Sequence, residues 1–172
     1  PSVSWSNARL DSEAATSAFS ARYGGQRFRS PQELFNSSAA DAVYICTRHD
    51  SHVEYIEMAV SRGMPIFCEK PLAPSTSEAL RAVKFVKGSN VPFALGFNHR
   101  YTAGVAALRD ELKKIGAIPD YLSIVLSPPP FLNGWPGRPH EGGGALVGLG
   151  SHAFDLATYL CGEPRSRPVG TA

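Results

Sequence analysis

Short apolar runs alternate with amphipathic stretches of about a dozen residues through the first hundred positions of the chain. The apolar runs are AVYICT at 42–47, IFCE at 66–69 and VPFALGF at 91–97. Between them lie HVEYIEMAVSRG at 52–63 and SEALRAVKFVKG at 77–88, where apolar residues recur at helical spacing and a glycine closes each stretch. The alternation predicts strands joined by helical crossovers in a parallel sheet, with the strand at 42–47 buried on both faces.

The two central helices are each expected to turn one apolar side inward. The residues predicted to face the core are Val53, Ile56 and Val60 in the first helix and Leu80, Val83 and Val86 in the second. Upstream, DSEAATSAFSAR at 11–22 predicts a further helix, and Ser30-Pro31 begins a short one because proline suits the first helical position.

The alternation of apolar runs and amphipathic stretches stops beyond residue 100, which indicates a second unit. TAGVAALRDELKKIG at 102–116 predicts a helix, and the alternation in YLSIVLS at 121–127 predicts a half-buried strand. A long irregular segment rich in proline and glycine follows at 127–144, of the kind that is often functional. The last prediction is an apolar helix over 145–162, interrupted by Gly148 and Gly150.

Polar residues follow each of the three apolar runs. They are Thr47-Arg48-His49, Glu69-Lys70-Pro71 and Asn98-His99-Arg100. Ligands of parallel α/β sheets collect at the carboxyl ends of the strands, so these segments are expected to line one crevice. A lysine at the end of a buried strand is costly unless it meets a ligand or a carboxylate. The plainer alternative, a surface turn with an exposed salt bridge, stays open for Lys70.

The stretch HEGGGALVGLGSHAFD at 140–155 raises two further interpretations. Its glycines lack both the GxGxxG spacing and the strand-to-helix position of a dinucleotide fingerprint, which excludes a phosphate loop here. His152 and Asp155 lie three residues apart, so they could share one edge of a helix and exchange protons, or His152 could be an ordinary core residue. The pair His49-x-x-His52 has no matching ligand pair, so we expect no metal site.

Composition narrows the class of protein. Of the 172 residues, 43% are hydrophobic and 19% charged, as in ordinary globular domains. The net charge of +2, without clustered basic residues, argues against nucleic acid as a partner. No apolar run approaches the roughly 20 residues that span a bilayer. Three scattered cysteines predict neither a disulfide framework nor a zinc site, and they favour a reducing, cytoplasmic setting.

Three motifs resemble those of the Gfo/Idh/MocA oxidoreductase family. They are AVYICTRHDSHVEYIEMAVSRGMPIFCEKPLA, GFNHRY and GGGALVGLGSHAFDLATYLCGEP, in the order and spacing of that family, over roughly residues 15–165. The segment TRHDSH and the glycine at 148 resemble most closely the branch whose members carry this module behind a zinc-alcohol-dehydrogenase-like domain.

The resemblance implies a fold and an activity. The fold class would be α/β, with a partial Rossmann-like parallel sheet over 1–96 followed by a truncated α/β (α+β) domain for substrate binding and oligomerisation over 97–172. The activity would be transfer of hydride between NAD or NADP and a sugar- or polyol-like alcohol or ketone. A homo-oligomer, or a partner chain covering exposed sheet edges, would follow.

The resemblance also implies a set of site residues. Lys70 would contact the substrate hydroxyl and the cofactor, and His152 would be the general acid/base. Asp155 is added as a catalytic residue because it could partly substitute for the aspartate that many family members carry four residues before the histidine. The residues expected along the cofactor are Thr47, Arg48, His52, Glu69, Lys70, Asn98 and Arg100. Proton transfer coupled to hydride transfer is chemistry that such groups perform.

The sequence departs from the family pattern at several places. Many members carry an aspartate four residues before the histidine, where this chain has Gly148, and the fused branch often has a glutamate where it has Leu149. No strand–GxGxxG–helix unit is present, and the sheet is expected to begin at the family's second strand, near Val3–Trp5. The end of that strand, Ser6-Asn7, carries no acidic residue that would select NAD over NADP.

These departures leave several interpretations open. The chain is a fragment of a longer enzyme, a natural truncation whose edges a partner covers, or a degenerate descendant. In the last case it would be a non-catalytic binding or assembly module that keeps the fold without the nucleotide phosphate site. We expect the first residue, which is not Met, to reflect a fragment or a processed product.

Overall fold

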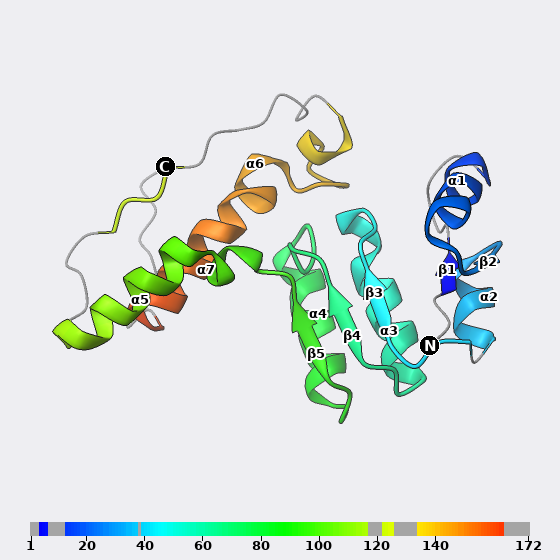
Figure 1. The fold of residues 1–172 in the computed structure, drawn as a ribbon, viewed down its shortest axis with the longest axis horizontal. Coiled ribbons are helices and arrows are strands. Elements are labelled where there is room, and N and C mark those ends of the chain that lie inside the picture. Colours follow the sequence, from blue (N-terminus) through cyan, green and yellow to red (C-terminus); the bar gives the residue numbers. More distant parts are fainter. Residues whose placement is uncertain (1–3, 7–12, 38, 117–121, 126–133, 164–172) are drawn as a thin grey trace.

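The computed structural model describes residues 4–6, 13–37, 39–116, 122–125 and 134–163. Its helices and strands follow the predicted alternation (Figure 1). In chain order they are β1 (Ser4–Ser6), α1 (Glu13–Tyr23), β2 (Gln26–Phe28), α2 (Pro31–Asn36), β3 (Val43–Ile45), α3 (His52–Ser61), β4 (Ile66–Cys68), α4 (Thr76–Lys87), β5 (Phe93–Leu95), α5 (Ala103–Ile115), α6 (Gly144–Gly148) and α7 (Gly150–Cys161).

Strands β3, β4 and β5 form a parallel sheet in that order, which confirms the predicted topology. Helices α3 and α4, the crossovers between these strands, lie together on one face of the sheet (Figure 1). Alternate strand residues point to that face, where Ile45, Ile66 and Cys68 are buried. With Val53 and Ile56 of α3 they form the hydrophobic core, as the periodicity of the sequence predicted.

The opposite face of this sheet is open within the described chain, which corrects the expectation that β3 is buried on both faces. Tyr44 and Phe67 are register partners on adjacent strands, and 57% and 37% of their surfaces are exposed. Their rings stack with centroids 4.7 Å apart. An apolar run indicates a strand but does not say which elements cover it, because a cover comes from distant parts of a chain or from a partner.

Helix α4 corrects a second expectation, about which residues face inward. Leu80 is 64% exposed, whereas Ala82 is fully buried. The helix packs against α3 through its small side, centred on Ala82, because alanine allows the two helices to approach closely. Ser75 begins the helix by accepting a hydrogen bond from the backbone N–H of Glu78, at 3.4 Å.

The N-terminal part forms a separate two-stranded parallel sheet, β1 with β2, flanked by α1 and α2 (Figure 1). Helix α2 begins at Pro31 as predicted, and Ser30 caps it, since its hydroxyl accepts a hydrogen bond from the Glu33 backbone N–H at 3.1 Å. The guanidinium of Arg62, after α3, donates to the Phe35 carbonyl at 2.5 Å and thereby joins this part to the main core. The predicted strand near Val3–Trp5 is described from Ser4 onward, and Val3 and Asn7 lie outside the described residues.

The helices described in the C-terminal part are α5, α6, α7 and the short 3₁₀ turn Trp135–Gly137. Helix α5, predicted over 102–116, ends at Ile115 and is capped by Gly116, whose φ of 68° suits glycine. Of the strand expected at 121–127, residues 122–125 form no strand, and 121, 126 and 127 lie outside the described residues. Alternation alone does not form a strand, because each one needs a neighbouring strand to pair its backbone, and none of the described strands lies beside these residues.

A search of the described residues for a helix long and apolar enough to cross a membrane finds none.

Candidate functional site

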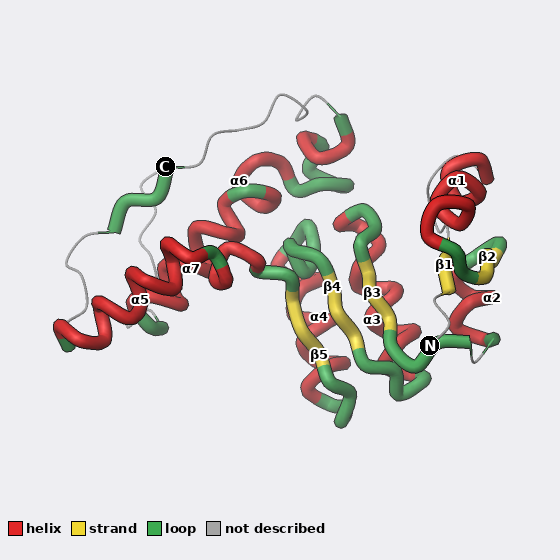
Figure 2. Tube along the Cα trace, in the orientation of Figure 1, coloured by secondary structure: helices red, strands yellow, loops and turns green. Residues whose placement is uncertain are grey.

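The polar segments after β3, β4 and β5 meet at one edge of the sheet, as predicted from their positions. Backbone hydrogen bonds continue the ladder past the strands, from Glu69 N–H to the Ile45 carbonyl and from Gly96 N–H to the Cys68 carbonyl, both at 2.8 Å. Parallel strands present their carboxyl ends at the same edge, so these turns lie side by side. The segment that leads into α6 extends toward the same edge (Figure 2).

Lys70 reaches from this edge to the start of the C-terminal helices. Its ammonium group donates a hydrogen bond to the Gly148 carbonyl at 2.7 Å, at the last residue of α6. Burial lowers the pKa of Lys70, and the nearby Glu69 carboxylate partly offsets this. The following Lys70–Pro71 peptide is cis. Because Lys70 contacts a backbone carbonyl rather than an exposed carboxylate, the structure does not fit the alternative of a simple surface salt bridge.

His152 lies on α7, close to Lys70 and 7% exposed. The expected helix over 145–162 is interrupted at Leu149, between α6 and α7, and Leu149 O accepts from the His152 backbone at 3.0 Å. Within the described chain the ring Nδ1 is buried without a hydrogen-bond partner. Burial, with the positive charge of Lys70 and the neighbouring His99, lowers the pKa of His152 to about 4. The ring is therefore neutral at pH 7 and able to accept a proton.

Asp155 is placed against Arg100 and not hydrogen-bonded to His152. The guanidinium Nε donates to both carboxylate oxygens, at 3.0 and 2.8 Å, and a second guanidinium nitrogen also donates to the carboxylate. This pairing raises the pKa of Arg100 and leaves Asp155 8% exposed. The spacing of His152 and Asp155 predicted a shared edge, but the carboxylate is bound by Arg100, 55 positions away in sequence.

Glu69 is held by a tyrosine that the sequence did not single out. The Tyr44 hydroxyl donates to the Glu69 carboxylate at 2.6 Å, and this hydrogen bond raises the pKa of Tyr44 to about 12. A Cβ added at Gly96 would lie 3.0 Å from the same carboxylate. Glycine at 96 therefore leaves the space in which the Glu69 side chain lies beside the end of β5.

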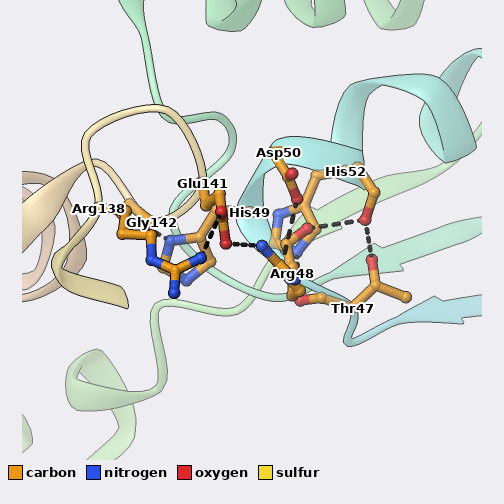
Figure 3. A network of polar contacts seen from close by, with 9 residues as sticks. Thr47, Arg48, His49, Asp50, His52, Arg138, Glu141 and Gly142 are labelled. Carbon is orange, nitrogen blue, oxygen red and sulfur yellow. Dashed lines mark hydrogen bonds and ion pairs between the residues drawn. The ribbon is translucent and has the colours of Figure 1, made fainter. Parts of the chain in front are cut away.

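Arg48 and His49 bind the glycine-rich segment to the end of β3 (Figure 3). Arg48 forms an ion pair with Glu141, and a ring nitrogen of His49 lies 2.9 Å from the Gly142 carbonyl. Trp135 packs beside both residues, with its ring centroid 4.9 Å from that of His49 and 5.6 Å from the Arg48 guanidinium carbon. We call these five residues, Arg48, His49, Trp135, Glu141 and Gly142, the loop clasp.

His52 is completely buried beneath this edge. Its Nδ1 lies 2.9 Å from the Pro71 carbonyl and its Nε2 lies 3.1 Å from the Thr47 carbonyl, and the neutral ring donates its one N–H to one of these two oxygens. Burial lowers its pKa. His52 connects the turn after β3 to the turn after β4 and thereby fixes their relative positions. The Thr47 hydroxyl is bound to Ser51 at 2.8 Å.

Some site residues escaped prediction from sequence. Trp135, Glu141 and Tyr44 are a loop aromatic, a loop acid and a strand residue with no motif around them, so their spacing carries no signal. His99 did carry a signal in the sequence, because it lies between Asn98 and Arg100 in a predicted strand-end segment. Asn98 itself is exposed at the rim. No group of three or more metal-ligating side chains occurs among the described residues.

A parallel α/β sheet with a lysine, a neutral histidine and polar turns at its carboxyl edge defines a ligand-binding α/β protein of the Rossmann type. The chain matches the family model of oxidoreductases with an NAD-binding Rossmann fold over residues 7–97, and that of the GFO/IDH/MocA C-terminal domain over residues 111–169. It therefore belongs to the Gfo/Idh/MocA family, as the motifs predicted.

Similar proteins include dehydrogenases of cyclitols and sugars. An inositol 2-dehydrogenase of Leifsonia xyli subsp. xyli is 32% identical over 165 residues, covering 92% of this chain and 46% of that protein. A levoglucosan dehydrogenase of Pseudarthrobacter phenanthrenivorans is 30% identical over 173 residues, covering 94% and 42%. Among solved structures, a levoglucosan dehydrogenase in complex with NADH and levoglucosan has a TM-score of 0.75 at 29% identity, covering 92% and 45%. The chain thus spans about half the length of the relatives it matches.

Proposed function

We propose that this chain carries the substrate end of an NAD(P)-dependent oxidoreductase that interconverts an alcohol and a ketone of a sugar or polyol. The observation that supports this most is the Lys70–Gly148 hydrogen bond, which holds an ammonium group beside the neutral His152. The names of the relatives, inositol 2-dehydrogenase and levoglucosan dehydrogenase, support the substrate class.

The residues present fit the nicotinamide end of such a cofactor. The Nδ1 of His152 is a buried polar atom without a partner among the described residues, as expected of a group that meets a ligand. Thr47, Arg48, Glu69 and Asn98 offer hydroxyl, guanidinium, carboxylate and amide groups at the same edge, and we propose that they line the cofactor. We propose a supporting role for His52 and Arg100, because His52 is buried against two carbonyls and Arg100 is bound to Asp155.

The chemistry proposed for the chain is proton transfer and charge stabilisation. Oxidation of an alcohol removes a hydride from carbon and a proton from oxygen, and a bound nicotinamide cofactor would take the hydride. His152, neutral at pH 7, accepts the hydroxyl proton, and in the reverse direction it returns that proton to the new hydroxyl. The ammonium group of Lys70 orients the substrate oxygen and stabilises negative charge that develops on it.

Activity of two variants tests this proposal. Lys70→Ala and His152→Ala are each expected to lower kcat/KM for an inositol or anhydrosugar substrate with NAD or NADP by about a hundredfold or more, as loss of a general acid/base does. Lys113→Ala is a matched control, since this lysine lies on α5 with 62% of its side chain exposed, and it should leave the rate unchanged. Turnover is followed by NAD(P)H absorbance.

Titration with NADH and NADPH distinguishes the alternative, a non-catalytic binding or assembly module. Saturable quenching or enhancement of cofactor fluorescence by the chain supports the oxidoreductase and shows which cofactor is preferred. An absence of binding, with unchanged rates in both variants, would contradict it and favour the module. Position 148 carries glycine where many family members have an aspartate, so the titration also shows whether the chain binds a cofactor without that carboxylate. A Cβ at position 148 would meet only the His49 ring, at 4.0 Å.

We also propose that the chain assembles with a second copy or a partner. The support is the open face of the β3–β5 sheet and the lack of pairing, among described strands, on the outer edges of β3 and β5. A cytoplasmic setting is supported by the free thiols of Cys46, Cys68 and Cys161. The domain division at residue 97 and the fused zinc-alcohol-dehydrogenase-like domain stay predictions.

A further inference from the structure

The ring of His99 lies flat on the ring of His152. Their centroids are 3.9 Å apart and their planes differ by 7°, so the two imidazoles are stacked. His99 belongs to the 3₁₀ turn Asn98–Tyr101 after β5, whereas His152 lies on α7. Phe97 meets His152 edge-on, with centroids 6.2 Å apart. The two aromatic contacts come from one turn and hold the imidazole from two directions.

The placement of His99 is fixed from both sides of the turn. Its carbonyl accepts hydrogen bonds from the Thr102 backbone at 3.2 Å and from the Thr102 hydroxyl at 3.0 Å. The next residue, Arg100, binds Asp155 with both oxygens of the carboxylate, one turn of helix beyond His152. This ion pair sets the register of the turn against α7, and that register places the His99 ring over the His152 ring.

We propose that His99 is a positioning residue whose stacked ring fixes the plane and the charge state of the His152 imidazole. The role rests on the proposed function in which His152 transfers the proton. Two stacked imidazoles oppose each other's protonation, because like charges at this separation repel strongly. A neutral His152 is the form that accepts a proton from a substrate hydroxyl.

The other charged groups around His152 leave a distinct part for His99. Burial and Lys70 lower the pKa of His152, His99 lowers it further, and Asp155 and Glu69 raise it. Lys70 is held on the Gly148 carbonyl and Asp155 on Arg100, so both stay in place when His99 is changed. Replacement of the ionisable ring at position 99 therefore tests the stacked imidazole by itself.

The test is a pH titration of the histidine imidazoles by NMR in the full chain, wild type against His99→Phe. Phenylalanine keeps a flat ring but carries no charge, so the pKa of His152 is expected to rise by on the order of half a unit to one unit. His140→Gln, a change at an exposed loop residue, serves to assign signals and should leave His152 unchanged. His99→Asn is a second uncharged variant in case the phenylalanine variant does not fold.

Kinetics supplies the second readout. In an active enzyme, the acid limb of the pH profile of kcat/KM should move to higher pH in His99→Phe, by the same amount as the pKa of His152. His99→Ala should also lower kcat, because the His152 ring loses the ring that supports it. A merely structural role would lower stability and leave the pH profile in place. An unchanged His152 titration in both His99→Phe and His99→Asn would overturn the inference. The NMR result does not need turnover, so an inactive chain with a shifted His152 would contradict only the proposed function.

Discussion

The chemistry of this site depends on single contacts that hold ionisable groups in unusual surroundings. His152 is 7% exposed and has no partner for its Nδ1 among described residues. Lys70 is half-buried on a carbonyl instead of being solvated. In both cases burial opposes the charged form, which is typical of functional residues and uncommon at positions that serve packing alone.

The titration of His152 predicts how stability depends on pH. Its folded-state pKa of about 4 lies below the ordinary value of 6.5, so between these values the unfolded chain binds a proton that the folded chain does not. The free energy of unfolding should therefore fall as the pH drops from 6.5 toward 4, by roughly 2 kcal/mol from this residue, after allowance for water in the crevice. His49 and His52, whose pKa values are also lowered, act in the same direction.

Urea unfolding at pH 7.5 and pH 4.5 measures this effect. The wild-type chain should lose more stability between the two conditions than His152→Asn, whose side chain does not titrate. His140→Asn, at an exposed histidine, should match the wild type. Equal losses in all three chains would contradict the assignment.

At the scale of elements, the loop clasp joins the glycine-rich segment to the sheet. The backbone N–H groups of Gly142 and Gly143 both donate to the Arg138 carbonyl, at 2.8 and 3.2 Å, and this tight turn precedes α6. A Cβ at Gly142 would overlap the backbone of Pro136. The glycine is thus required because two stretches of backbone approach each other closely, not because of a phosphate.

Gly142→Ala is expected to lower the free energy of unfolding by about 1–3 kcal/mol, as overpacking against rigid backbone does. Amide hydrogen exchange should quicken at the turn that begins α6, since the bonds to the Arg138 carbonyl would be disturbed. Gly104→Ala provides the matched control. Nothing lies within 4 Å of a Cβ at that position in α5, and alanine there should raise stability by about 0.5–1 kcal/mol. A neutral effect of Gly142→Ala would refute the close approach.

At the scale of the whole molecule, contacts of the candidate site join the ends of the described strands to the C-terminal helices. Lys70 to Gly148, His49 to Gly142 and Arg48 to Glu141 connect strand ends to the segment that contains the glycines and α6. Arg100 to Asp155 and the stacked rings of His99 and His152 connect the turn after β5 to α7. The residues of the proposed site therefore also make tertiary contacts between distant parts of the chain. The opposite face of the sheet, with the rings of Tyr44 and Phe67, stays exposed, and only the Tyr44 hydroxyl links that aromatic pair to the site, through Glu69.

Size-exclusion chromatography with light scattering tests whether that face is covered by assembly. The chain should show a mass above its own 18.4 kDa, because an exposed stacked aromatic pair favours association. Tyr44→Lys should shift the population toward monomer. Leu80→Lys, at a leucine that is 64% exposed on α4, should not. A monomer of the wild-type chain at all concentrations would contradict the proposed assembly.

Much of the fold could be predicted from the sequence because it depends on local patterns. The alternation of apolar runs and amphipathic stretches located β3, β4 and β5 with α3, α4 and α5, and Ser30-Pro31 located α2. Errors occurred where local pattern was a poor guide to neighbours. Leu80 was placed inward and residues 122–125 in a strand, since both inferences assumed a packing partner that is not found there among the described residues. The short strand β2 had no apolar pattern to indicate it.

The sequence by itself determined the family, through its three motifs. It also determined the parallel sheet and the edge at which Lys70 and the strand-end turns meet, because strands joined by helical crossovers run parallel and present their carboxyl ends at one edge. Only the tertiary structure decided which groups face one another across that edge. Asp155 pairs with Arg100 instead of His152, His152 lies under His99, and Gly148 is bound by Lys70. These contacts join residues far apart in the chain, and their geometry depends on how α6 and α7 are placed against the turns after the strands, which no spacing within one segment encodes.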